Sequence, residues 1–132
     1  MIHTTMVAVA LLAVASPVAA QTDTASNYPN RAIRVVVPYP AGGTSDILAR
    51  AIGPHLTTAW GQPVIVENRT GANGNVGADF VAKSAPDGYT LLMGPSGPMT
   101  MNPAIYSKLP YDPLRDFVPV SMIGDFPLIL VV

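Results

Sequence analysis

The sequence contains no cysteine, and this absence excludes several classes of protein at once. A chain without cysteine has no disulfide framework, no thiolate metal site and no lipid anchor attached through a thiol. Export from the cytoplasm remains compatible with the sequence, because a periplasmic protein with an adequate core folds without disulfides.

Charged residues are also scarce: they make up 11% of the 132 residues, where about 25% is usual. The formal net charge is −1, and the Lys and Arg residues form no basic cluster. Because binding to nucleic acid depends on basic patches that neutralise phosphates, no nucleic-acid partner is expected. The chain length predicts one small domain.

The N-terminus has the features of a signal peptide. Residues 6–15 are apolar but too few to span a bilayer, and Pro17 ends the stretch. Small residues up to Ala20 suit a signal peptidase. We expect residues 1–20 to be a leader cleaved near Ala20, residues 21–30 to be a flexible mature N-terminus, and the protein to be periplasmic. The first five residues contain no Lys or Arg, so either the start lies upstream or the leader is weak.

Short runs rich in β-branched or apolar residues predict five strands. These runs lie at residues 32–37, 64–67, 89–93, 118–123 and 128–132. Because the chain ends within the last of these apolar runs, we expect the sequence to be truncated at its C-terminus.

Helices are predicted between the strands. The first follows a cap at Thr44 or Ser45, has Asp46 in its first turn and runs to about Trp60, with a kink or break at Gly53-Pro54. The second spans residues 76–84, and a helix-like turn follows at residues 102–106. In the second helix, inward-facing side chains are expected at Val76, Phe80 and Val81 or Ala82. Strands that alternate with helices predict an α/β fold with a mainly parallel sheet and helices on both faces.

Two loops follow predicted strands and are rich in Gly, Pro, Ser and Thr. They span residues 39–46 and 94–102. In an open parallel sheet, ligands bind at the carboxyl ends of the strands, where backbone N–H groups at a helix start attract anions. Hydroxyl donors are available from Thr44, Ser45, Ser96 and Thr100. The pattern favours capture of an anion by dipoles, although ordinary turns with helix caps would give the same sequence.

The sequence does not favour an enzyme. The segment around Ser96 has Pro98 where a nucleophile elbow needs its last glycine. His55 is isolated in a helical stretch, and the acidic residues are scattered without pairing. We therefore expect no catalytic residues, no metal site and no cofactor.

Three long motifs carry a resemblance to a known family. They read YPNRAIRVVVPYPAGGTSD from Tyr28, VENRTGANGNVGADFVAKSAPDGYTLLMG from Val66 and MNPAIYSKLPYDPLRDFVPVSMI from Met101. In this order they resemble the Bug family, the substrate-binding proteins of tripartite tricarboxylate transporters. The resemblance covers nearly the whole mature chain.

The resemblance implies a periplasmic binding protein of type II that closes its two lobes on a small carboxylate. Residues 31–132 would form the first lobe, and the second lobe would be missing. The implied partners are a small-molecule carboxylate and the membrane transporter subunits, and the complete protein would be a monomer. Carried over by position, the ligand-binding candidates are Tyr39, Gly42, Gly43, Thr44, Asp46, Ser96, Thr100 and Asn102. Pro95 and Met99 depart from the family pattern, which leaves the identity of the carboxylate open.

Two alternatives remain beside transport. Some members of the family are thought to act as ligand sensors for a membrane histidine kinase. A truncated chain that lacks its second lobe could also be a non-functional product.

Overall fold

A three-stranded parallel sheet forms the centre of the computed structural model, which describes residues 27–125 and residue 130. The strands are β1 (Ile33–Val37), β2 (Val64–Asn68) and β3 (Thr90–Leu92), in the order β2-β1-β3. Val35 in the middle of β1 pairs with Val66 on one side and with Leu91 on the other. The α/β class and the parallel sheet predicted from the sequence are thus confirmed.

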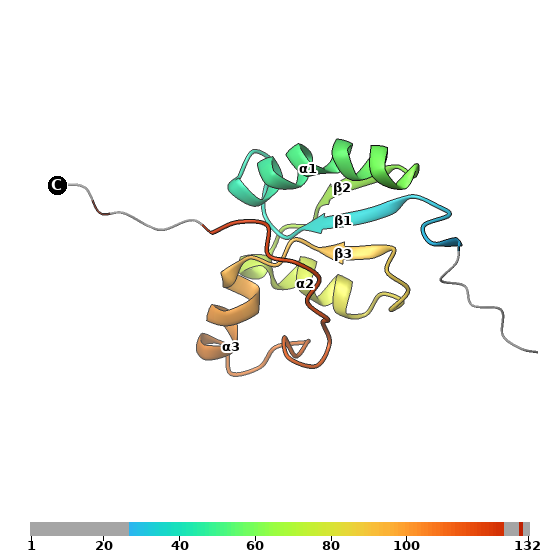
Figure 1. The fold of residues 1–132 in the computed structure, drawn as a ribbon. Coiled ribbons are helices and arrows are strands. Elements are labelled where there is room, and N and C mark those ends of the chain that lie inside the picture. The colour runs from blue at the N-terminus through green and yellow to red at the C-terminus, as the bar shows by residue number, and fades with distance from the viewer. Residues whose placement is uncertain (1–26, 126–129, 131–132) are drawn as a thin grey trace, which may run out of the picture.

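The central strand is apolar because helices cover both faces of the sheet. Ile33, Val36 and Val37 of β1 have no exposed surface. Helix α1 (Thr44–Trp60) packs against β2 and β1, and α2 (Asn75–Ala82) packs against β3 and β1 from the opposite face (Figure 1). Two crossovers that lead to opposite sides of β1 produce this two-faced arrangement, as expected when both crossovers have the same hand.

The strand order decides where a ligand could bind. The chain leaves β1 toward β2 and returns to the other side of β1 to form β3. The carboxyl ends of β1 and β3 therefore lie on either side of a topological switch point, which is the usual ligand position in open α/β sheets.

Helix α1 differs from its prediction at two points. Its N-cap residue is Gly43, and no side chain makes a capping hydrogen bond, so the predicted hydroxyl cap at Thr44 or Ser45 is wrong. The helix also continues through Pro54 without a break. Pro54 is exposed, which leaves room for its ring outside the core. The helix ends at Gly61, whose φ of 66° is left-handed as helix ends often require.

The prediction for the inward face of α2 is wrong at Val76, which is 49% exposed. The buried residues of this helix are Asn75, Gly77 and Ala78, whereas Phe80 is half-buried. The reason is a close backbone approach: a Cβ atom at Gly77 would lie 2.9 Å from the Cβ of Pro38. Small residues therefore occupy the inner face at the start of the helix.

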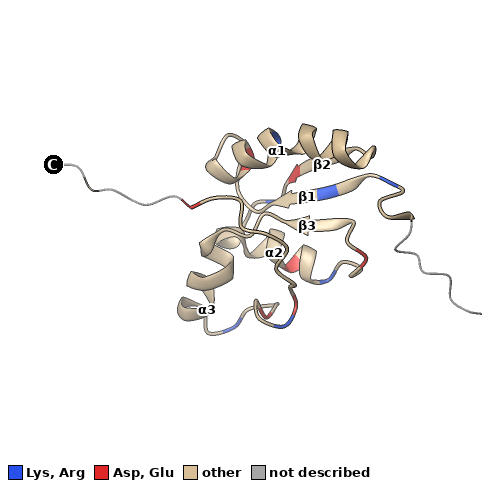
Figure 2. Ribbon diagram, viewed as in Figure 1, with Lys and Arg blue, Asp and Glu red and all other residues tan. Residues whose placement is uncertain are grey.

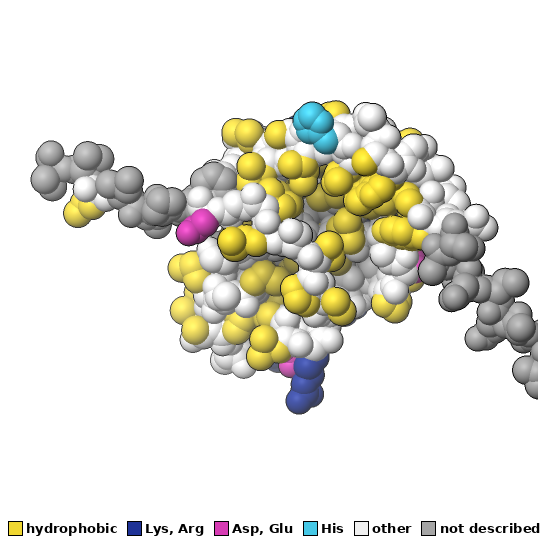
Figure 3. Space-filling view, in the orientation of Figure 1, with side chains coloured by type: hydrophobic (Ala, Val, Ile, Leu, Met, Phe, Trp, Pro, Cys, Tyr) yellow, Lys and Arg dark blue, Asp and Glu magenta, His cyan; other side chains and the backbone are white. Residues whose placement is uncertain are grey.

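After β3 the chain forms a short π-helical turn, η3 (Gly97–Met101), followed by α3 (Asn102–Ile105). The strand predicted at residues 118–123 is not formed in this structure. Val118, Val120 and Met122 are each more than four-fifths exposed, because no neighbouring strand pairs with this segment among the described residues. Figure 3 shows hydrophobic side chains spread over the face of the molecule that is seen in Figure 1.

Three predictions fall wholly or mainly outside the described residues. They concern the leader at residues 1–20, the mature N-terminus up to residue 26, and the strand at residues 128–132, where only Leu130 is described. Within the described part of the chain, no helix combines the length and the apolar character needed to cross a membrane.

Candidate anion-binding site

Three loops meet at the carboxyl ends of the strands. Residues 38–43 follow β1, residues 69–74 follow β2 and include the turn η2 (Ala72–Gly74), and residues 93–96 follow β3. Gly74 is the meeting point: a Cβ atom there would lie 3.4 Å from the Cβ of Pro38 and 3.3 Å from the ring of Pro98. The two loops predicted as binding loops are thus neighbours, and a third loop lies between them.

The loop after β1 exposes its backbone. Gly42, Gly43 and Thr44 are exposed, and Tyr39 and Ser45 are half-buried. The first N–H groups of α1 have no acceptor inside the helix, so this end carries partial positive charge. Neither binding loop contains Lys or Arg in its sequence, and charged residues are few along the whole ribbon in Figure 2. An anion at this position would be held by dipoles and hydroxyl groups.

Asp46 fixes this loop from behind. Asp46 is only 3% exposed, and its Oδ2 atom accepts a hydrogen bond of 2.8 Å from the N–H of Gly42. Arg50 donates its Nε–H to both carboxylate oxygens at 3.0 Å, and Asn68 donates from Nδ2 to Oδ1 at 3.0 Å. Asn68 also donates to the carbonyl of Tyr39 at 3.0 Å. The carboxylate therefore links β2, α1 and the exposed loop.

These contacts lower the pKa of Asp46 from 3.8 to about 2. The hydrogen bond from Arg50 is the largest cause, followed by the bonds from Gly42 and Asn68. Asp46 is therefore ionised at every physiological pH, with Arg50 as its counter-ion. Its buried side chain stabilises the conformation of the loop through the hydrogen bond with Gly42.

The loop after β3 touches the loop after β1 through Tyr39 and Gly97. Gly97 is buried, and a Cβ atom there would collide with the hydroxyl of Tyr39. Ser96 and Thr100 are exposed, and the hydroxyl of Thr100 donates to the carbonyl of Ser96 at 2.8 Å. Exposed hydroxyl groups thus line the second side of the candidate site.

Asn102, another predicted site residue, has no exposed surface. Its Nδ2 donates to the carbonyl of Asn73 at 3.0 Å and to Oδ1 of Asn75 at 2.6 Å. Its Oδ1 accepts a bond of 2.7 Å from Nδ2 of Asn73. Asn102 and Asp46 therefore point into the protein, whereas the other six predicted residues lie at the surface or close to it.

Sequence reasoning missed the polar residues that support the two loops. These are Arg50, Asn68, Asn73, Asn75 and Tyr111. A weak signal was present for Asn68, because a polar residue directly after a buried strand faces the ligand edge of the sheet. Tyr111 gave none, since it contacts Asn75 across 36 residues of sequence.

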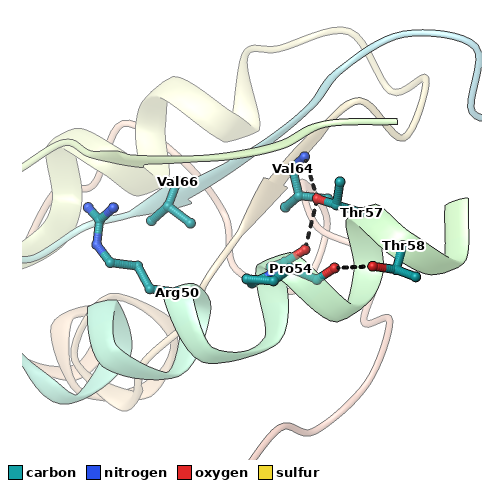
Figure 4. A pocket seen from close by; sticks show the side chains of 7 residues that line it. Arg50, Pro54, Thr57, Thr58, Val64 and Val66 are labelled. Atoms are coloured by element: carbon teal, nitrogen blue, oxygen red, sulfur yellow. Dashed lines mark hydrogen bonds between the residues drawn. The ribbon is translucent and has the colours of Figure 1, made fainter. Parts of the chain in front are cut away.

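A groove lies away from the strand ends. It has a volume of about 550 Å³ between α1 and β2 and is lined by Arg50, Gly53, Pro54, Thr57, Thr58, Val64 and Val66 (Figure 4). Within it, the hydroxyl of Thr57 accepts from the N–H of Val64 at 3.1 Å and donates to the carbonyl of Gly53 at 3.0 Å. Among the described residues, no three His, Asp or Glu side chains form a group that could hold a metal ion.

Comparison with known proteins gives consistent results. The family model for the tripartite tricarboxylate transporter family receptor matches residues 48–132. BugT of Bordetella pertussis is 47% identical over 124 residues, which cover 93% of this chain and 36% of that protein. The chain thus spans about a third of the length of the curated relatives it matches, since the shares for the first three are 36%, 31% and 38%.

Solved structures agree with the fold described above. MatC from Rhodopseudomonas palustris, solved with bound malate, aligns with a TM-score of 0.70 at 42% identity, over 73% of this chain and 33% of that one. A second R. palustris protein, solved with adipate, gives a TM-score of 0.64 at 41% identity, over 66% and 29% of the two chains. The periplasmic binding protein BugD gives 0.61 at 35% identity, over 68% of this chain and 30% of that one. The prediction of a lobe of a periplasmic binding protein is thus confirmed.

Proposed function

The chain belongs to the tripartite tricarboxylate transporter receptor family, and on this premise we propose that it forms one lobe of a periplasmic receptor for a small carboxylate. The ligand is a di- or tricarboxylate or a similar organic acid, which the complete receptor delivers to membrane transporter subunits. Two of the similar structures were solved with carboxylates, malate and adipate, and this supports the ligand class.

The observation that carries the proposal is the exposed backbone between β1 and α1. Gly42, Gly43 and Thr44 are presented to solvent at the start of a 17-residue helix, while Asp46 holds the loop from inside. The N–H groups of Gly42 and Gly43 are already bonded, to Oδ2 of Asp46 and to the carbonyl of Pro40. The N–H groups of the first helical turn, from Thr44 on, have no acceptor within the helix, and such groups attract a carboxylate without a paired cation. A carboxylate bound there lies within reach of hydroxyl groups from both loops.

The remaining parts of the proposal follow from this role. Residues 1–20 are cleaved on export near Ala20, residues 21–30 join the leader to the domain, and residues 31–132 contribute the first lobe. The complete receptor acts as a monomer in the periplasm and catalyses no reaction. A single lobe offers walls on only one side of the ligand, so its own affinity is modest.

The test is isothermal titration of the chain with malate and with adipate. Binding should be detectable for the wild type and weaker by about tenfold for Thr44→Val, which removes an exposed hydroxyl from the loop. Thr58→Val is the matched control, because Thr58 lies on the same helix and its hydroxyl only donates to the carbonyl of Pro54. Equal affinities for the two variants would contradict the site, and no binding by the wild type would contradict the function.

A further inference from the structure

A network of polar side chains, three of them buried and Asn73 exposed, connects the loop after β2 with the segment after β3. It consists of Asn73, Asn75, Asn102 and Tyr111, and none of its side chains is charged. Asn102 has no exposed surface, and Asn75 and Tyr111 are each 6% exposed. Burying a carboxamide costs free energy unless its donors and acceptor are paired, and those of Asn102 are paired with protein groups.

The network holds a strained stretch of backbone. Asn73 has φ 55° and ψ 40°, and its neighbour Ala72 has φ 46°, which is a left-handed conformation that side chains rarely adopt. Asn102 forms two hydrogen bonds with Asn73: it donates to the carbonyl of Asn73 and accepts from the side chain of Asn73. Such a conformation persists only where the surroundings determine it.

Tyr111 adds a second connection between the same segments. Its hydroxyl lies 2.7 Å from Oδ1 of Asn75, at the start of α2, and 2.9 Å from the carbonyl of Pro98 in η3. Burial raises the pKa of Tyr111 above its ordinary value, so the phenol keeps its proton and remains a donor. The loop after β2 and the turn after β3 are therefore tied at two points.

The loop after β2 and the turn η3 also contact the first binding loop, η3 through the side chain of Tyr39. The hydroxyl of Tyr39 lies so close to Gly97 of η3 that a Cβ atom at Gly97 would collide with it. Pro38, directly before Tyr39, packs against Gly74 of the loop after β2. The relative positions of both binding loops thus depend on a network in which Asn75, Asn102 and Tyr111 are shielded from solvent.

We propose that Asn102 is a positioning residue of the carboxylate site: its buried carboxamide fastens the loop after β2 to the turn after β3, and this fixes the two binding loops relative to each other. The inference rests on the proposed function, because it assigns a role within that site. In this role Asn102 acts on the ligand through the loops and does not touch it.

The test compares Asn102→Asp with Asn30→Asp. The first change keeps the shape of the side chain but replaces the NH₂ donor with oxygen, which faces the carbonyl of Asn73 and Oδ1 of Asn75. The second is a matched control, since Asn30 is exposed before β1 and its Oδ1 accepts from the hydroxyl of Tyr89, as a carboxylate would. Both variants carry the same change of charge.

Titration with malate, at a temperature at which each variant is folded, should show about a tenfold or greater loss of affinity for Asn102→Asp. The control should remain within about twofold of the wild type. Asn73→Gly provides a milder variant that keeps a left-handed backbone accessible and removes only the bond to Oδ1 of Asn102. The affinity of Asn73→Gly for malate should fall about threefold, and this variant replaces Asn102→Asp in the test if Asn102→Asp does not fold.

Amide hydrogen exchange supplies a readout that needs no ligand. Asn102→Asp should accelerate exchange in residues 71–75 and 97–101 together, because the two segments lose their shared clamp. Wild-type affinity for malate in Asn102→Asp, or faster exchange in only one of the segments, would overturn the inference. Failure of the wild-type chain to bind malate or adipate would instead overturn the proposed function, while the exchange result would still decide whether Asn102 couples the segments.

Discussion

The carboxylate of Asp46 accepts a hydrogen bond of 2.8 Å from the N–H of Gly42, four residues earlier in the chain. Gly42 has a left-handed φ of 84°, and of the residues between the two partners Gly43 and Thr44 are exposed. A side chain in the first turn of α1 thus reaches back and fixes the loop that leads into the helix. Hydroxyl residues beside it remain available for a ligand.

Asp46→Asn should lower both the melting temperature and the affinity for malate. The variant loses the ion pair with Arg50 and weakens the bonds that hold Gly42 and Asn68. We expect malate affinity to fall by about tenfold or more, measured by isothermal titration. Asp87→Asn is the control, because Asp87 pairs with Arg31 at 2.7 Å but is 40% exposed. A melting temperature as high as that of the control would contradict the role given to Asp46.

The stabilising effect of Asp46 should disappear in acid. Its pKa in the folded state, about 2, lies below the ordinary value of 3.8, so ionised Asp46 stabilises the fold fully above pH 3.8. This contribution is lost as the pH falls from 3.8 toward 2. Thermal unfolding of the wild type and Asp46→Asn should therefore show a difference that is constant near neutral pH and shrinks across this interval. A difference that does not change with pH would show that the charge is unimportant.

Two buried helical glycines should respond to alanine in opposite ways. At Gly77 a Cβ atom would lie 2.8 Å from the carbonyl of Arg69 and 2.9 Å from Pro38, so Gly77→Ala should destabilise the protein by about 1–3 kcal/mol. At Gly53 the nearest atom would be Val64 at 3.9 Å. Gly53→Ala should stabilise α1 by about 0.5–1 kcal/mol. Urea denaturation measures both, and equal effects would contradict the close packing of α2 on the loop after β1.

Thr57 and Thr58 are adjacent in α1, but only the hydroxyl of Thr57 forms a hydrogen bond with a strand, at Val64 of β2. Thr57→Val should lower the free energy of unfolding by about 1–2 kcal/mol, because the N–H of Val64 at the edge of the sheet loses its acceptor. Thr58 makes only the bond to Pro54 within its own helix and is exposed, so Thr58→Val should stay within about 0.5 kcal/mol. Urea denaturation of the two variants side by side decides whether the bond to Val64 stabilises the sheet edge.

Much of the architecture could be predicted from local sequence. The β-branched run at residues 32–37 is apolar except for the exposed Arg34, as in a strand covered on both faces, and it forms β1. Glycines at positions 61 and 71 mark where α1 ends and where the loop after β2 turns. Periodicity could not reveal the inner face of α2, because the close approach of Gly77 to Pro38 replaces the usual apolar contacts there.

The strand expected at residues 118–123 and the residues that support the site loops could not be predicted reliably, because both depend on contacts between residues far apart in the sequence. The apolar run at residues 118–123 has the composition of a strand, but a strand also needs a neighbour, and none of the described residues pairs with it. The loops of the candidate site were predictable as glycine-rich connections after strands. Their support was not, since Asn102 and Tyr111 contact Asn75 across 27 and 36 residues of sequence.

The most direct test of the carboxylate site is a titration of the ¹⁵N-labelled chain with malate, followed through the backbone amide resonances. The largest shifts should appear at Gly42, Gly43 and Thr44 and at residues 96–100, on the two sides of the switch point. Small, uniform shifts, or shifts concentrated along the groove between α1 and β2, would contradict a carboxylate site at the carboxyl ends of β1 and β3.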